Sequence, residues 1–151
     1  MANRRKYKLA SVGLVLALCV GLLAGCGGME FPKKGKALDP DRKKKVVLIA
    51  KSTESAFWKS VFSGANAAST EYNMELMTRG PKNEEDYQTQ NDMIEEAVAD
   101  GADAIIFSAI DYEENADAIN AAAQKGVKII VIDSDVNSNR VECRIGTDNY
   151  E

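Results

Sequence analysis

Polar and aromatic side chains follow three of the strands that the sequence predicts, at the point where each strand ends. They are Lys51, Ser52, Ser55, Phe57 and Trp58 after the first strand, Ser108 and Asp111 after the third, and Asp133, Ser134 and Asp135 after the fourth. The carboxyl ends of parallel strands meet at one rim of a sheet, and ligands bind in the crevice outside that rim. Carboxylate, ammonium and hydroxyl groups gathered there can hydrogen-bond a polar small molecule.

Asp133 and Lys51 are the strongest candidates for contact with a ligand. Asp133 comes directly after an apolar strand, and Lys51 directly follows the apolar run 46–50. A charge in such a place needs water, a partner of opposite charge or a ligand. Asp111 is interpreted with equal weight as a ligand contact or as a cap of the helix that follows it.

An enzymatic alternative rests on two of these aspartates. Asp133-x-Asp135 after an apolar strand resembles the first motif of haloacid-dehalogenase-type phosphatases, in which the first Asp is the nucleophile and the second an acid or base, with magnesium. That family carries the motif on its first strand, and Asn137 occupies a position where its pattern has Thr or Val. The sequence has no histidine and no phosphate-binding glycine loop. We therefore expect a binding protein without enzymatic activity, cofactor or metal site.

Short apolar runs alternate with segments of helical spacing from residue 46 onward. The pattern predicts strands at 46–50, 73–78, 104–107, 128–132 and 141–145, with helices at about 55–72, from about 83 to 100 and from about 111 to 125. Gly101 and Gly126 are expected to end the second and third helices. Strands that alternate with helices in this way indicate an α/β fold with a doubly wound parallel sheet.

The spacing also predicts which side chains face the sheet. In the first helix these are expected to be Phe57, Val61, Ala65, Ala68 and Tyr72. Trp58, one position further round the helix, is then expected to face partly away from the core and to line the cleft. Cys143 is expected to be a small buried residue.

The first 25 residues resemble a bacterial lipoprotein signal peptide. A basic start is followed by an uncharged apolar run, and the run ends in Leu23-Ala24-Gly25-Cys26, which resembles the lipobox. The resemblance implies cleavage before Cys26, lipid on its thiol and a stable anchor in the membrane. The alternative is an uncleaved anchor helix, although the run is at the lower limit of length for a membrane span.

Residues 26–45 have the composition of a solvated linker, with glycines, prolines and many lysines. Basic residues cluster in the first 25 residues and in this linker, whereas the whole chain carries a net charge of −4. The domain that follows is therefore acidic. An acidic domain argues against nucleic acid as a partner, because such binding depends on basic contacts with phosphates. The chain is thus divided into 1–25, 26–45 and a single domain at 46–151.

The domain resembles the amino-terminal lobe of type I periplasmic sugar-binding proteins of the ribose-binding group. The matching pieces are VVLIAKSTESAFWKSV, Gly80-Pro81, DGADAIIFSAID, QKGVKIIVIDSDV and IGTDNY, and their order and spacing together are specific. The effector domain of LacI-type repressors has the same fold, but those proteins carry a helix-turn-helix where this chain has a secretion signal. Members of the family have a second lobe and a hinge, so we expect this chain to be the first part of a longer protein.

The resemblance implies a function and a set of contacts. The function is that of the substrate-binding lipoprotein of an ABC transporter, which captures a sugar for a membrane permease on the outer side of the membrane; a sensor component is an alternative. The implied ligand-binding residues are Lys51, Ser52, Phe57, Trp58, Asp111, Asp133, Ser134 and Asp148, with lipid on Cys26. Lys51 and Ser134 stand where ribose binders have Ser and Arg. Lys51 together with Gly80-Pro81 and Asp133-Ser134-Asp135 is more similar to the rhamnose-type branch.

Overall fold

The computed structural model describes residues 42–147 as one α/β unit. Its elements in chain order are β1 (Lys45–Ile49), α2 (Ala56–Glu71), β2 (Glu75–Arg79), α3 (Tyr87–Ala99), β3 (Ala104–Phe107), α4 (Ala116–Gln124), β4 (Lys128–Ile132) and β5 (Cys143–Ile145). The expectations for the signal peptide, Cys26, most of the linker and Asp148 lie outside the described residues. No helix within 42–147 combines the length and the apolar character that a membrane crossing requires.

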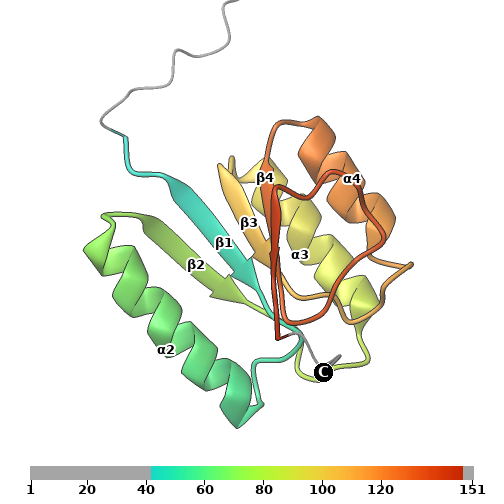
Figure 1. Ribbon diagram of the computed structural model, residues 1–151, viewed down its shortest axis with the longest axis horizontal. Coiled ribbons are helices and arrows are strands. Elements are labelled where there is room, and N and C mark those ends of the chain that lie inside the picture. Colours follow the sequence, from blue (N-terminus) through green and yellow to red (C-terminus); the bar gives the residue numbers. More distant parts are fainter. Residues whose placement is uncertain (1–41, 148–151) are drawn as a thin grey trace, which may run out of the picture. The chain divides into compact units, whose positions relative to one another are not determined.

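The sheet has the strand order β2-β1-β3-β4-β5, and every pair is parallel. Helix α2 covers one face, whereas α3 and α4 cover the other (Figure 1). After β1 the chain turns to one side of the sheet to form β2, and it then passes β1 to form β3 on the other side. The predicted doubly wound sheet is confirmed, and its strand order reverses between β1 and β3, the usual place for a ligand.

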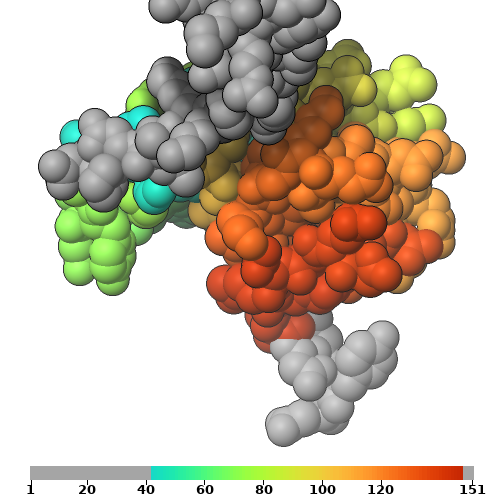
Figure 2. Space-filling view, turned by 90° about the horizontal axis from the view of Figure 1, so that it is seen from above, coloured from blue at the N-terminus to red at the C-terminus, as the bar shows by residue number. Residues whose placement is uncertain are grey.

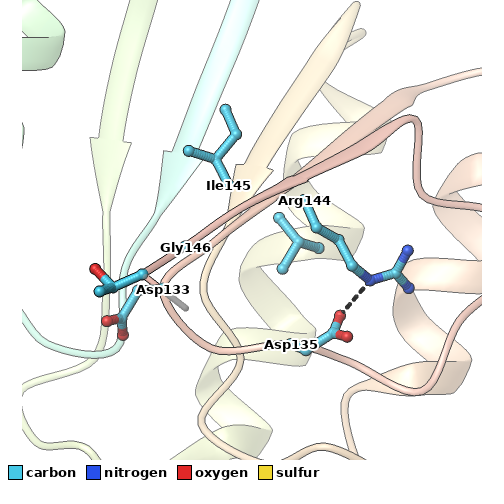
Figure 3. A pocket seen from close by; sticks show the side chains of 7 residues that line it. Asp133, Asp135, Arg144, Ile145 and Gly146 are labelled. Atoms are coloured by element: carbon cyan, nitrogen blue, oxygen red, sulfur yellow. Dashed lines mark hydrogen bonds and ion pairs between the residues drawn. The ribbon is translucent and has the colours of Figure 1, made fainter. Parts of the chain in front are cut away.

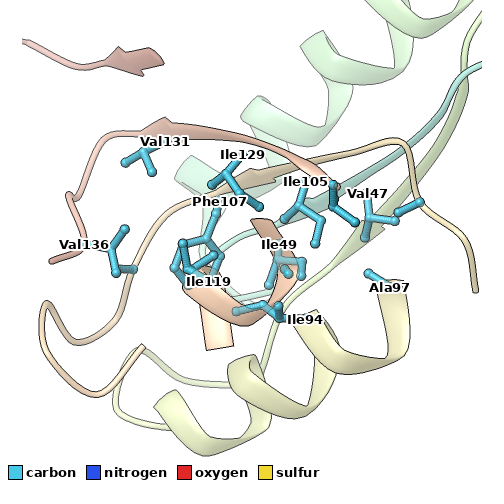
Figure 4. Packing of buried hydrophobic residues seen from close by; sticks show 14 of the residues in the cluster. Val47, Ile49, Ile94, Ala97, Ile105, Phe107, Ile119, Ile129, Val131 and Val136 are labelled. Carbon is cyan, nitrogen blue, oxygen red and sulfur yellow. The ribbon is translucent and has the colours of Figure 1, made fainter. Parts of the chain in front are cut away.

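Two apolar clusters hold the layers together because β1 is buried on both faces. Its side chains alternate: Val47 and Ile49 point toward α3 and α4, and Leu48 and Ala50 point toward α2. The larger cluster lies under α3 and α4 (Figure 4), and its principal members are Val47, Ile49, Ile94, Ala97, Ile105, Phe107, Ile119, Ile129, Val131 and Val136. Strands that are apolar on both faces, such as β1, are typical of a parallel sheet that helices cover on both sides.

The buried face of α2 differs from the one that the spacing predicted. Trp58 is 1% exposed and packs with Leu48 and Ala50, whereas Phe57 is 57% exposed and Tyr72 is 69% exposed. The predictions that Phe57 belongs to the core and that Trp58 faces partly away from it are therefore wrong. Both possible stripes include Val61 and Ala65, so the spacing does not separate them. The observed stripe buries the indole of Trp58, which is larger than the ring of Phe57, together with much of Phe62. It therefore removes more apolar surface from water.

Strand β5 is shorter and more exposed than predicted. It comprises three residues, all exposed, and Cys143 is exposed rather than buried. Figure 2 shows this last described segment, in red, on the surface of the molecule. The physical reason is that, within residues 42–147, β5 pairs only with β4 and neither helical layer packs on it.

Candidate ligand-binding site

Lys51 lies at the centre of a polar cluster at the carboxyl rim of the sheet. Its ammonium group donates to Ser134 Oγ at 2.9 Å and contacts Asp133 Oδ2 at 3.2 Å. Glu84 Oε2 is 3.9 Å from the same nitrogen. Of the three kinds of partner expected for this charge, namely water, an opposite charge or a ligand, the structure shows the opposite charge, and it comes from segments that are far apart in the sequence.

Asp133 reaches this cluster through an unusual backbone conformation. Its φ of 59° lies in the left-handed region, which Asp and Asn tolerate better than other non-glycine residues. Its amide donates to the carbonyl of Ile145 at 3.0 Å, and its carboxylate also accepts from Ser134 Oγ at 3.2 Å. A left-handed residue persists only where its surroundings hold it, and such positions are often found at functional sites.

An open hollow of about 310 Å³ lies beside the cluster. We call it the rim hollow, and it is lined by Lys51, Ser55, Phe57, Trp58, Glu84 and Asp133. The ring of Phe57 packs edge-on against Trp58, with 4.9 Å between the ring centroids and an interplanar angle of 80°. Because Phe57 is exposed and Trp58 is buried, Phe57 offers the accessible aromatic surface and Trp58 supports it from the core.

Glu84 is a residue of the hollow that the sequence did not indicate. It lies in the loop before α3, and its Oε1 accepts a hydrogen bond from Trp58 Nε1 at 3.1 Å. An indole N–H can only donate, and a buried one normally finds an acceptor. If Trp58 is placed in the core, its indole N–H needs such an acceptor, but the helical spacing of the sequence does not identify the residue that supplies it.

A second hollow, of about 240 Å³, adjoins the first at Asp133 (Figure 3). We call it the edge hollow, and its lining consists of Val131, Asp133, Asp135, Arg144, Ile145, Gly146 and Thr147. Asp135 points toward Arg144 and accepts from its Nε at 2.7 Å. It also accepts from the Val136 amide at 2.8 Å. The second carboxylate of the phosphatase-like motif is thus paired with an arginine, which does not favour the enzymatic alternative.

Three of the predicted site residues, Ser52, Asp111 and Ser134, line neither hollow, although Ser134 accepts from Lys51. Ser52 is 3% exposed; its Oγ donates to the carbonyl of Lys82 and accepts from the amide of Glu54, both at 3.0 Å. Asp111 Oδ1 accepts from the amides of Glu113 and Glu114, both at 2.9 Å, and these backbone hydrogen bonds lower the pKa of Asp111. The structure gives Ser52 a role in holding a loop and Asp111 the role of closing the turn before α4.

Gln90 joins the ends of β1, which precedes Lys51, and of its neighbour β3. This buried side chain donates from Nε2 to the carbonyls of Ala50 and Ser108, each at 2.9 Å. Its Oε1 accepts from the Ile110 amide at 3.0 Å. Its amide thus joins the ends of β1 and β3 from the buried face of α3, where the strand order reverses.

Comparison with known families decides what kind of domain this is. A model described as "Periplasmic binding protein domain" matches residues 46–151. The chain belongs to this family. The predicted resemblance is therefore confirmed, and the family is one of binding proteins.

Individual relatives agree with this assignment. The ribose import binding protein of Bacillus subtilis is 24% identical over 93% of this chain and 46% of its own length. A sugar transporter structure from Clostridium phytofermentans has a TM-score of 0.68 and 37% identity over 71% of this chain and 40% of its own. A carbohydrate transporter solute binding protein from Agrobacterium radiobacter, solved with D-arabinose, has a TM-score of 0.69 and 29% identity over 72% of this chain and 37% of its own. The chain thus spans less than half the length of these relatives.

Proposed function

We propose that this protein is the substrate-binding component of an ABC importer and that it captures a sugar or a sugar-like small molecule. The observation that carries the proposal is the rim hollow, where Lys51 and Asp133 lie beside the exposed ring of Phe57. The membership of the periplasmic binding protein family supports it, as do a relative named for ribose import and a structure solved with D-arabinose. We propose that the protein binds its ligand without converting it.

The chemistry of the hollow suits a sugar. Sugars present hydroxyl groups around a ring whose C–H faces are weakly apolar. Carboxylate and ammonium groups such as those of Asp133 and Lys51 hydrogen-bond the hydroxyls, and an aromatic face such as that of Phe57 covers the C–H surface. Asp148, which the resemblance places at the crossover toward a second lobe, stays a proposed contact.

The proposed ligand is enclosed only when a second lobe closes over the hollow. The rim hollow is open, and the chain covers less than half of the relatives' length. Closure of two lobes about a hinge removes water from the ligand and strengthens each polar contact. We therefore propose that the opposite wall of the site comes from a further part of the protein.

The direct test is a titration of the protein, as its gene encodes it, with D-ribose and D-arabinose. Trp58 lines the hollow, so tryptophan fluorescence can be followed beside the heat of binding. We expect saturable heat and a matching change in emission for at least one pentose. The absence of both signals across pentoses and hexoses, with magnesium-dependent hydrolysis of phosphate esters instead, would overturn the proposal.

We also propose that Cys26 carries the lipid anchor and that the mature protein lies on the outer face of the cell membrane. Metabolic labelling with a palmitate analogue in a bacterial host tests this. Wild type and a Cys143→Ala variant should be labelled, because the exposed Cys143 serves as a matched control thiol. Cys26→Ala should be unlabelled, and equal labelling of all three proteins would contradict the anchor.

A further inference from the structure

Three charged side chains line the rim hollow, and two of them are negative. Lys51 is the positive one, and Glu84 and Asp133 are the negative ones. Both carboxylates are close to the Lys51 ammonium nitrogen: Glu84 Oε2 is 3.9 Å away and Asp133 Oδ2 is 3.2 Å away. One ammonium group cannot neutralise two carboxylates, so these lining residues leave the hollow with a net negative charge.

The neighbouring carboxylate does not add to this excess in the same way. Asp135, in the edge hollow, is paired with the guanidinium group of Arg144. The excess charge of the rim hollow therefore comes from Glu84 and Asp133. A charged ligand that entered the hollow would lie well within one Debye length of both, about 10 Å at 0.1 M salt.

Glu84 is held in place by a contact that is separate from its charge. Its Oε1 accepts from the indole of Trp58, whereas its Oε2 is the atom that faces Lys51. The side chain thus joins the aromatic wall of the hollow to its charged cluster. A neutral amide in its place could keep the first contact and would lose the charge.

We propose that Glu84 is a specificity-determining residue, which makes the rim hollow accept neutral sugars and reject phosphorylated or carboxylated ones. The inference rests on the proposed function, since it names the class of sugar that the same hollow binds. A negatively charged ligand is repelled by the carboxylates of the hollow, whereas a neutral sugar is not, so these charges contribute more to specificity than to affinity. Asp133 contributes to the same repulsion, but it is also proposed to contact the sugar, so Glu84 is the residue whose charge can be changed alone.

The experiment compares three variants of the protein as its gene encodes it. Glu84→Gln keeps an acceptor for Trp58 and removes the charge, and Glu84→Ala removes both. Glu85→Gln is the matched control, because Glu85 is an exposed neighbour that lines neither hollow. The probes are D-ribose and D-arabinose and their 5-phosphates, titrated by calorimetry at low salt.

We expect wild type to bind the neutral pentose at least tenfold more tightly than its 5-phosphate. Glu84→Gln should keep the affinity for the neutral sugar within about threefold and should reduce this discrimination at least fivefold, and added salt should reduce it in wild type as well. Glu85→Gln should behave as wild type. Equal discrimination by wild type and Glu84→Gln, or an equal change in Glu85→Gln, would overturn the inference while leaving sugar binding intact.

A second measurement judges the inference even if neither pentose binds, an outcome that would count against the proposed function alone. Quenching of Trp58 fluorescence by iodide, an anion, is compared with quenching by neutral acrylamide. We expect Glu84→Gln to raise the iodide constant relative to the acrylamide constant at least twofold, with no such change in Glu85→Gln. Glu84→Ala should in addition shift the Trp58 emission, and the glutamine variant should restore it. An unchanged ratio in Glu84→Gln would contradict the charge-based rejection.

Discussion

Lys51 shows how one residue can join the architecture of this domain to its site. It comes soon after a strand that is buried on both faces, so its ammonium group needs polar partners at the rim of the sheet. It finds them in Asp133 and Ser134, which follow β4. The sheet thereby places groups from β1 and β4 within hydrogen-bonding distance, although 83 positions separate Lys51 from Ser134.

Gln90 allows a test of stability at the same scale. Gln90→Ala would leave the carbonyls of Ala50 and Ser108 and the amide of Ile110 without this partner. Buried polar groups that lose a partner cost about 1–3 kcal/mol each when nothing replaces it. We expect the free energy of unfolding in urea to fall by about 3 kcal/mol.

The control for this measurement is Gln88→Ala, an exposed position of α3 two residues before Gln90. Surface substitutions of this kind usually change stability by less than about 0.5 kcal/mol. Similar losses in the two variants would show that the strand ends do not depend on the Gln90 amide.

Among the elements, α2 separates a core role from a site role in two adjacent aromatic residues. Trp58 is buried against Leu48 and Ala50, so Trp58→Ala should lower the free energy of unfolding by about 3–5 kcal/mol. Phe57→Ala should leave stability within about 0.5 kcal/mol of wild type. It should weaken sugar binding several-fold, because an aromatic contact contributes roughly 1 kcal/mol.

Urea unfolding curves and sugar titrations on the two variants check this assignment. A large loss of stability in Phe57→Ala with a neutral Trp58→Ala would restore the face that the spacing predicted. Loss of binding in neither variant would remove the aromatic wall from the site.

The cap of α3 gives a prediction for the pH dependence of stability. Asp86 accepts from the hydroxyl and from the amide of Thr89, at 2.7 and 3.0 Å, and these hydrogen bonds lower the pKa of Asp86. A carboxyl whose pKa is lower in the folded state stabilises that state above its unfolded pKa, and the stabilisation is lost as the pH falls through the folded pKa. The contribution should therefore be complete at pH 7 and should decline from about pH 4 downward.

Asp86→Asn tests the cap, because asparagine can still accept from the Thr89 amide but carries no charge near the positive end of the helix. We expect the variant to be less stable than wild type at pH 7 and the difference to shrink at pH 3. Asp92→Asn, an exposed aspartate within the same helix, should show no comparable trend. A difference for Asp86→Asn that is constant from pH 7 to pH 3 would contradict the role of the charge.

The elements that the sequence predicted best are those whose signals are local. The strands 104–107 and 128–132 were predicted to the residue, and Ser55 and Tyr72 do flank the first helix. The glycines that end α3 and α4 have φ values of 77° and 89°, as that role requires. These features depend on short apolar runs and on backbone conformations that few residues adopt.

What the sequence could not settle depends on contacts between distant segments. The choice between Phe57 and Trp58 depends on how α2 is rotated against β1. The role of Glu84 depends on the tertiary contact that brings the Trp58 indole N–H to the loop before α3. The exposure of Cys143 depends on whether a further layer packs on β5. In each case the local pattern is compatible with two arrangements, and only the packed structure distinguishes them.

At the scale of the whole molecule, the domain presents one rim of a parallel sheet and carries its polar groups there. Asp133 lines both hollows of that rim, and its left-handed backbone turns its carboxylate to Lys51. The relatives are more than twice as long as the part of them that this chain matches. We therefore expect Asp133 to be the principal contact of this lobe with a ligand held between it and a second lobe.

The most direct test of this claim is a calorimetric titration of wild type, Asp133→Asn and Asp135→Asn with the pentose that binds best. A hydrogen bond to a charged group is worth roughly 1.5–3 kcal/mol, so Asp133→Asn should weaken binding at least tenfold. Asp135→Asn removes the same charge from a carboxylate that is paired with Arg144 outside the rim hollow, and it should bind within about threefold of wild type. Normal binding by Asp133→Asn, or an equal loss in both variants, would contradict the placement of the site.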